Sequence, residues 1–207
     1  MCLSVAGLEA LSCNSLSWRH PLPRSLTALS ANFSSETQED QLCVVLRQLP
    51  ALKHLSLYVD FRQTPDLLAA LAFAPRLTYL SMLCIEAAAP QLGALPDSLE
   101  VVRLQIPSAV NYDIEQWLTR LAALPCCHSL MLIGFRLTGD AAVRGGMGSF
   151  PALRRLWCAA GDLAPLEAAR AAAGLPPIEL AACPRRSGCS PPRRWQCPTS
   201  ASRHARC

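Results

Sequence analysis

The sequence predicts an α/β solenoid, in which short parallel strands stack side by side and helices cover one side of the resulting sheet. Three observations support this. An apolar motif recurs along most of the chain, prolines keep the same phase as the motif, and helix-like segments fill several of the spacers. The composition agrees, because 51% hydrophobic residues with only 6% aromatic residues suit a core that repeats small aliphatic side chains.

The recurring motif is apolar-x-x-apolar-x-apolar, in which x is any residue. Successive copies begin 18, 26, 25, 22, 28, 26 and 22 residues apart. A single copy cannot bury its apolar side, so a series of copies predicts a stack of short strands. The five strong copies begin at Leu52, Leu77, Leu99, Cys127 and Leu153, and the three weaker ones at Leu8, Leu26 and Leu175.

Prolines precede the strong copies by two or three residues, at Pro50, Pro75, Pro96, Pro125 and Pro151. A proline there ends the preceding segment and favours an extended start to the next strand. An alternative is a Leu/Ala-rich helical protein in which the motif arises from composition alone. The prolines disfavour it, because a helical heptad pattern would continue through them.

Four spacers are typical of helices, namely 40–49, 66–73, 113–124 and 162–173. Each begins with an Asp that can cap the helix or favour its positive end, and each is rich in Leu, Ala or Glu. The repeating unit is therefore a short strand, a helix, a proline and the next strand.

With these features, residues 8–180 resemble a leucine-rich-repeat domain of the irregular kind seen in F-box-associated and ribonuclease-inhibitor-like proteins. The resemblance implies a curved parallel sheet with helices on its convex side, about seven to eight irregular repeats, and a role in protein binding. We expect no F-box ahead of the repeats, which begin by residue 8. The Asn or Cys ladder of the family is not regular here, since Asn14 and Asn111 are isolated. The expected domains are repeats over 1–182 and a tail over 183–207.

Alternation along each strand assigns the x positions of the motif to the concave face. Tyr, Trp and Arg among them are residue types enriched at the energetic centres of interfaces. The alternative is an ordinary solvated strand face. The predicted partner-binding residues are His54, Ser56, Tyr58, Tyr79, Ser81, Arg103, Gln105, Arg155 and Trp157.

No motif predicts an enzyme, a metal site or a cofactor. The four histidines are scattered, and the glycine-rich run 145–148 lacks the residues of a phosphate-binding loop, so we expect a flexible loop between repeats. Cys126 and Cys127 precede His128, which leaves a redox or metal role as an alternative. We favour a core thiol at Cys127, because it occupies the first apolar position of its repeat, and we expect buried thiols likewise at Cys13, Cys43, Cys84 and Cys158, which lie within apolar segments.

The tail over 183–207 contains six Arg and no acidic residue, which leaves a net charge of 13 − 15 = −2 for residues 1–182. With four Pro and almost no aliphatic residues, the tail is expected to be disordered when free. Weak contact with nucleic acid is an alternative role, through Arg185, Arg186, Arg193, Arg194 and Trp195. Its four cysteines lack the close spacing of structural zinc sites.

No apolar stretch approaches the roughly 20 residues that span a bilayer, and the first ten residues lack a basic segment. We therefore expect a cytoplasmic or nuclear protein with reduced thiols and no membrane partner. Residues 1–5 show no polar cap, so self-association or a partner at that end is also predicted. The favoured function is a non-catalytic protein-binding module, either a substrate-recognition or a scaffold subunit.

Overall fold

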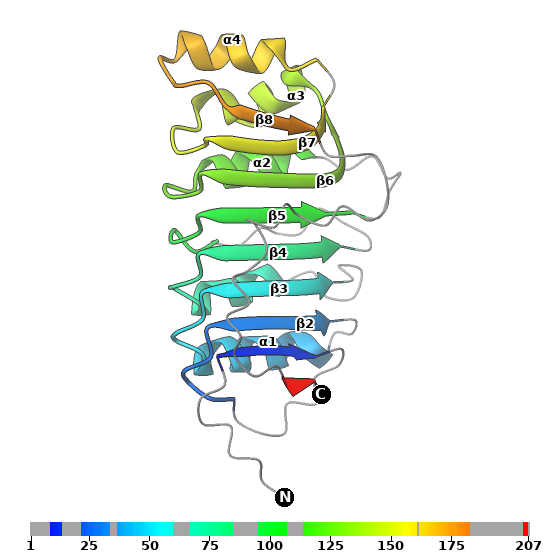
Figure 1. Cartoon of the computed structure of the whole chain (residues 1–207), viewed down its shortest axis with the longest axis vertical. Helices are drawn as coiled ribbons and strands as arrows, with labels where there is room; N and C mark the ends of the chain where they lie inside the picture. Colours follow the sequence, from blue (N-terminus) through cyan, green and yellow to red (C-terminus); the bar gives the residue numbers. More distant parts are fainter. Residues whose placement is uncertain are drawn as a thin grey trace, which may run out of the picture.

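The computed structural model describes residues 9–13, 22–33, 37–59, 67–84, 95–106, 114–160, 162–182 and 205–206. Within these ranges the strands form one sheet, ordered β8-β7-β6-β5-β4-β3-β2-β1-β9, and every neighbouring pair is parallel (Figure 1). The predicted α/β stack of parallel strands is confirmed. The strands are β1 (Ala10–Cys13), β2 (Ala28–Phe33), β3 (His54–Val59), β4 (Tyr79–Cys84), β5 (Val101–Gln105), β6 (Ser129–Leu137), β7 (Arg155–Ala160), β8 (Glu179–Ala182) and β9 (Ala205–Arg206).

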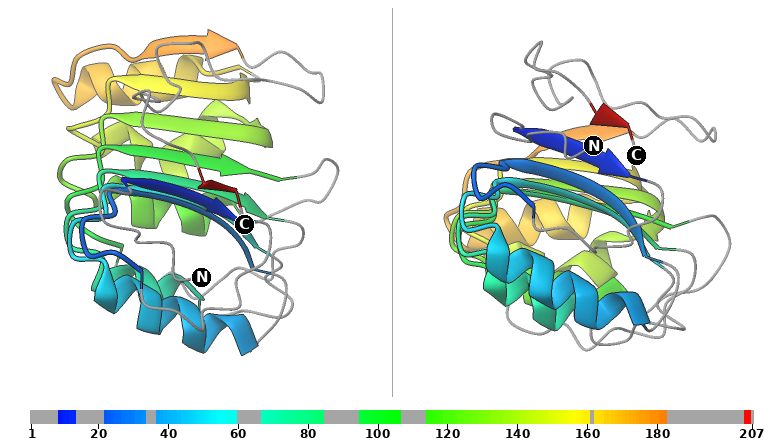
Figure 2. Two further views of the ribbon diagram at one scale, coloured as in Figure 1. Left: turned by 60° about the horizontal axis from the view of Figure 1, so that its bottom comes forward. Right: turned by 90° about the horizontal axis from the view of Figure 1, so that it is seen from below.

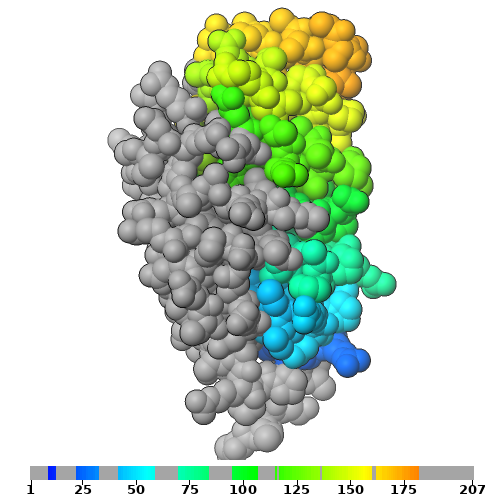
Figure 3. All heavy atoms as spheres, turned by 180° about the vertical axis from the view of Figure 1, so that it is seen from behind, coloured from blue at the N-terminus to red at the C-terminus, as the bar shows by residue number. Residues whose placement is uncertain are grey.

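All described helices lie on the same side of the sheet (Figures 1 and 2). Seen from that side, the colours follow the sequence order along the long axis, as expected when each repeat packs mainly on its neighbours (Figure 3). We call the opposite side, formed by the outward side chains of the strands, the helix-free face. The helices are α1 (Thr37–Gln48), α2 (Ile114–Ala122), α3 (Gly139–Arg144) and α4 (Ala164–Ala172), with 3-10 turns η1 (Leu67–Phe73) and η2 (Met147–Ser149).

The motif positions align in register across the sheet. Leu29 faces Leu55, Leu55 faces Leu80, and the same row continues to β8. These side chains are buried along β1–β7, and burial of each contributes about 1.5–3 kcal/mol. The first motif positions form a second buried row. All eight predicted strands are therefore confirmed, and the fully buried first positions are Leu26, Leu52, Leu77, Leu99, Cys127 and Leu153.

A ladder of backbone carbonyls joins the starts of successive strands. The carbonyl of Thr27 accepts hydrogen bonds from the N–H groups of Lys53 and His54, and the carbonyl of Lys53 does the same for Thr78 and Tyr79. The donor–acceptor distances in this ladder are 2.8–3.2 Å. Main-chain groups thus hold the strand starts without a regular row of Asn side chains. The six carbonyls that accept two such bonds belong to Glu9, Thr27, Lys53, Thr78, Glu100 and His128.

Tight turns explain two of the in-phase prolines. The N–H of Leu52 donates to the carbonyl of Leu49 at 3.1 Å, which places Pro50 second in the turn, and the N–H of Leu77 donates to the carbonyl of Ala74 at 3.0 Å around Pro75. Proline favours that position because its ring fixes φ near −65°. Pro50 and Pro75 therefore turn the chain into the next strand, whereas Pro96 is first in its turn and its carbonyl accepts the N–H of Leu99 at 3.1 Å.

The predicted helices are confirmed in three of four spacers. Over 66–73 the chain forms the 3-10 turn η1 instead of an α-helix. Asp162 lies one residue before the N-cap of α4, which is Leu163, and its Oδ1 accepts a hydrogen bond from the N–H of Ala164 at 3.0 Å. Asp40 lies inside α1 and does not cap it. Asp66 and Asp113 lie outside the described residues.

The glycine-rich run differs from the predicted flexible loop. Gly145 caps α3, and Gly146 leads into η2 with φ of +80°. Gly145 and Gly148 are buried. A Cβ atom at Gly145 would lie 2.5 Å from the Leu118 Cβ, so the glycine allows α3 to approach α2 closely. The run is a packed junction between helices.

Strand β6 contains a bulge, which shifts its pairing with β7 between Leu132 and Arg136. Gly134 lies in the bulge with φ of +86°, a left-handed conformation that residues with a Cβ rarely adopt. A Cβ there would lie 2.3 Å from the Ile106 carbonyl oxygen. The bulge therefore depends on glycine for both its conformation and its close contact with the end of the β5 segment.

Arg170 of α4 is only 2% exposed and lies in the core of the last repeats. Its Nη1 donates to the carbonyls of Met147 and Phe150 at 3.2 and 2.9 Å. Its Nη2 donates to the carbonyls of Leu153 and Pro176 at 3.2 and 3.0 Å, and its Nε donates to Pro176 at 3.2 Å. The guanidinium group thus satisfies four backbone acceptors, three in the segment 147–153 and one at Pro176.

The two ends of the repeat stack differ from one another. At one end, Leu180 of the outer strand β8 is 40% exposed and borders a groove of about 280 Å³ beneath α4. At the other end, β9, which lies within the predicted tail, pairs with β1. At these two residues the structure departs from the predicted disorder, because the edge of β1 offers backbone groups that another strand can pair with. Residues 1–5 and 183–204 lie outside the described residues.

Candidate recognition surface

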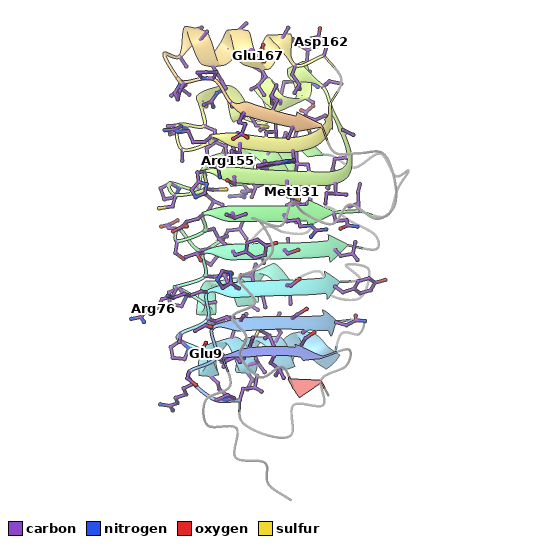
Figure 4. All side chains as sticks on the ribbon, viewed as in Figure 1. Glu9, Arg76, Met131, Arg155, Asp162 and Glu167 are labelled. Carbon is purple, nitrogen blue, oxygen red and sulfur yellow. The ribbon has the colours of Figure 1, made fainter. Side chains whose placement is uncertain are left out.

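The parallel register arranges the outward side chains of the strands in rows on the helix-free face. One row contains Ser56, Ser81, Arg103, Met131 and Trp157, each facing the next across neighbouring strands. A parallel row runs from His54 through Tyr79 to Arg155, and Figure 4 shows Met131 and Arg155 on this face. All nine residues predicted for the concave face occupy outward positions of β3, β4, β5 and β7.

Exposure varies along these rows. In β3, β4 and β5 inward residues are buried and outward residues are half-buried, as strand alternation predicts. In β6 and β7 three outward residues are buried as well: Ser129 is 1% exposed, and Met131 and Trp157 are each 8% exposed, whereas Arg155 is half-buried. Trp157 thus keeps its outward position but is less exposed than strand alternation predicts.

A shallow hollow lies where the rows of β4, β5, β6 and β7 meet. Ser129 and Met131 form part of this hollow. Both occupy x positions of the motif that begins at Cys127, but their residue types did not predict a contact. The free space in the hollow is about 10 Å³, roughly that of one water molecule. Its walls are formed by Tyr79, Val101, Arg103, Ser129, Leu130, Met131 and Trp157.

Arg103 is the cationic group of this hollow. Its Nη2 donates a hydrogen bond to the Oε1 of Gln105 at 2.9 Å, while its Nε is buried without a hydrogen-bond partner. Among the described residues no carboxylate pairs with it. Arg155 differs, because its Nε lies 3.2 Å from the Oε2 of Glu179. Among the described side chains, Arg155 is thus paired with a carboxylate and Arg103 is not.

Two further polar side chains on this face have buried atoms without partners, namely the Oδ1 of Asn32 and the Nδ1 of His54. The His54 ring lies 5.8 Å from the ring of Tyr79 on the neighbouring strand. Burial, with a smaller contribution from the charge of Lys53, lowers the pKa of His54. His54 is consequently neutral near pH 7 and offers a polar edge rather than a charge.

A serine, a histidine and a glutamate meet at the start of β6. The Nδ1 of His128 lies 2.7 Å from the Oγ of Ser129, and its Nε2 lies 3.9 Å from the Oε2 of Glu100. Nucleophilic catalysis requires a reachable hydroxyl and a base held by a hydrogen bond. Here Ser129 is 1% exposed, and 3.9 Å exceeds hydrogen-bond distance. The trio is arranged as a polar contact at a strand start.

The adjacent cysteines have opposite environments. Cys127 is fully buried, and burial raises its pKa to about 12, whereas Cys126 is exposed. The predicted core thiols are thus found at Cys127 and Cys158, and Cys43 is half-buried against the core. The side chains of Cys13 and Cys84 lie outside the described ones. The described residues contain no group of three or more His, Cys, Asp or Glu able to hold a metal ion.

We expect iodoacetamide at pH 8 to alkylate Cys126 in the folded protein and to leave Cys127 unmodified. Only the thiolate reacts, and a pKa of about 12 leaves a very small thiolate fraction on a buried sulfur. Tandem mass spectrometry of the peptide that contains both residues distinguishes them. In urea both cysteines should react, which serves as the control. Equal labelling of the two in the folded protein would contradict burial of Cys127.

The remaining predicted contacts, Arg185, Arg186, Arg193, Arg194 and Trp195, lie outside the described residues. No described helix combines the length and apolar character needed to cross a bilayer. Comparison with protein-family models and with curated protein sequences found no match to this chain.

Proposed function

We propose that this chain is a leucine-rich-repeat protein that binds another protein through its helix-free face, as a recognition or scaffold subunit. One observation carries the proposal: residues from four successive repeats come together around the hollow at Arg103. Tyr79, Arg103 and Trp157 belong to the residue types that dominate binding energy at interfaces. Met131 adds a flexible apolar side chain that adapts to different partners.

The arrangement supports binding rather than chemistry. The hollow combines one cation with apolar walls. The cation provides an anchor for the partner, and the apolar walls exclude water around it, as at the centre of a protein interface. In the row of Arg103, small residues flank the hollow on the side of β3 and β4, where Ser56 and Ser81 are half-buried. A partner that lies across the strands thus meets a low surface that leads to the hollow.

The test compares affinity capture by the whole chain with capture by three variants. The face variant replaces Tyr58, Tyr79 and Arg103 with Ala. Trp157 is left unchanged, because truncating a residue that is 8% exposed would also destabilise the fold. The control variant replaces exposed residues of the helix side, Val44, Arg120 and Val143, with Ala. The third variant ends at Ala182 and lacks both β9 and the arginine tail.

We expect the face variant to lose a common set of captured proteins by at least about 10-fold, while the control variant and the truncation retain them. Each candidate is then titrated as a purified protein by calorimetry. Circular dichroism confirms that all variants are folded. Loss of the same proteins only on truncation would assign binding to the tail, and a steep dependence on salt would then indicate nucleic acid.

A further inference from the structure

The charge on Arg103 lacks a counterion within the described part of the chain. Arg103 is half-buried, Tyr79, Met131 and Trp157 line the same hollow, and among the described residues its one side-chain hydrogen-bond partner is Gln105. A cation in apolar surroundings is unfavourable unless an anion compensates it. Arg155 lies on the same face two strands away, on β7, and the carboxylate of Glu179 already compensates its charge. The surface around Arg103 is therefore complementary to a negatively charged group.

The size of the hollow selects among anions. Its free space of about 10 Å³ accommodates a single small group, such as one carboxylate oxygen. A phosphate has more charge and more oxygens, and a good phosphate site offers several donors. Here Arg103 is the one arginine of the hollow, and Glu179 adds negative charge beside Arg155. These observations favour a carboxylate over a phosphate.

The apolar walls of the hollow favour an apolar side chain beside that carboxylate. Met131 and Trp157 form an apolar rim on β6 and β7, adjacent to Arg103 in the same row. An aliphatic side chain placed there removes apolar surface from water on both partners. One N–H group of the Arg103 Nη2 donates to Gln105, which leaves the other N–H groups of Nη1 and Nη2 for the carboxylate. The planar guanidinium group matches the geometry of a carboxylate.

We infer that the helix-free face recognises an acidic peptide segment, in which an Asp or Glu pairs with Arg103 and a neighbouring aliphatic residue packs on Met131 and Trp157. This inference rests on the proposed function and specifies the partner class. It assigns the carboxylate to Arg103 and not to Arg155, whose charge is already paired.

The test uses a random-peptide phage library selected on the immobilised full-length protein. Selected peptides should be enriched in Asp or Glu next to Leu, Ile, Val or Met. For one such peptide, Arg103→Gln should weaken binding by roughly 10-fold or more, since a hydrogen bond to a charged group is lost. Arg155→Gln, the matched control on the same face, should weaken it by less than about 3-fold.

A double-mutant cycle completes the test. Replacing the acidic residue of the peptide with its amide should reduce binding to the wild-type protein by the same factor and have little further effect on Arg103→Gln. Peptides without an acidic residue that still depend on Tyr58 and Tyr79 would overturn this inference but leave the proposed function standing. Tighter binding of a phosphorylated peptide would also overturn it. Failure to select any peptide would count against both.

Discussion

Replacing Arg170 with Met is expected to lower the free energy of unfolding by about 3–5 kcal/mol. The substitution keeps the apolar stem and removes the five N–H groups that bind four carbonyls. The carbonyls of Phe150 and Leu153, whose hydrogen bonds with Arg170 are buried, then lose this donor. Burial, with a smaller contribution from Arg154, lowers the pKa of Arg170, but arginine stays charged at neutral pH.

Urea unfolding followed by circular dichroism measures the loss, and Arg120→Met is the control. Arg120 is exposed in the last turn of α2, so its replacement should change stability by less than about 0.5 kcal/mol. Arg170→Lys should fall between the two, because an ammonium group reaches fewer of the four carbonyls. Hydrogen exchange should accelerate first in α4 and β8 and leave β3 and β4 unchanged. A uniform acceleration would contradict a local role for Arg170.

Replacing Gly134 with Ala should be the second most damaging change, at about 2–4 kcal/mol. Two effects add. Alanine is strained at a φ of +86°, and its Cβ would lie 2.3 Å from the carbonyl oxygen of Ile106, where only a backbone shift relieves the overlap. That shift also disturbs the hydrogen bond from the N–H of Ile106 to the carbonyl of Ile133, now 2.9 Å long.

Gly174 provides a control that isolates the overlap. Its φ is +67°, but a Cβ there has no described atom within 4 Å, so Gly174→Ala should lose only the conformational strain, about 1 kcal/mol. Thermal unfolding of both variants beside the wild type makes the comparison. Equal losses would show that the contact with Ile106 contributes nothing.

The strand positions were predictable because each depends on local pattern. Leu55 and Leu57 alternate with outward residues, and Pro50 fixes the turn before them, so a window of about ten residues determines the strand. The lateral register also followed, because motif positions of equal phase face one another. The outward positions of His54, Tyr79 and Arg103 were correct for the same reason.

What was missed depends on contacts between distant residues. Arg170 lies in an Ala-rich helix, where the sequence suggests a solvated side chain, and its acceptors lie 6 to 23 residues away. The bulge at Gly134 depends on the approach of Ile106. The glycines of 145–148 indicated flexibility, but their small size serves close packing of α3. The hollow at Arg103 arises only when four strands are placed side by side.

The carbonyl ladder at the strand starts consists of main-chain groups, so it does not depend on which side chains point outward. Residues such as Arg103 can therefore change over evolutionary time without altering how one repeat docks on the next. Neighbouring strands lie about 4.8 Å apart, so the outward residues of successive repeats follow one another at this spacing. Gain or loss of a repeat would therefore move a recognition residue by about 4.8 Å along the sheet. Substitutions of outward residues give access to new partners and leave the core unchanged.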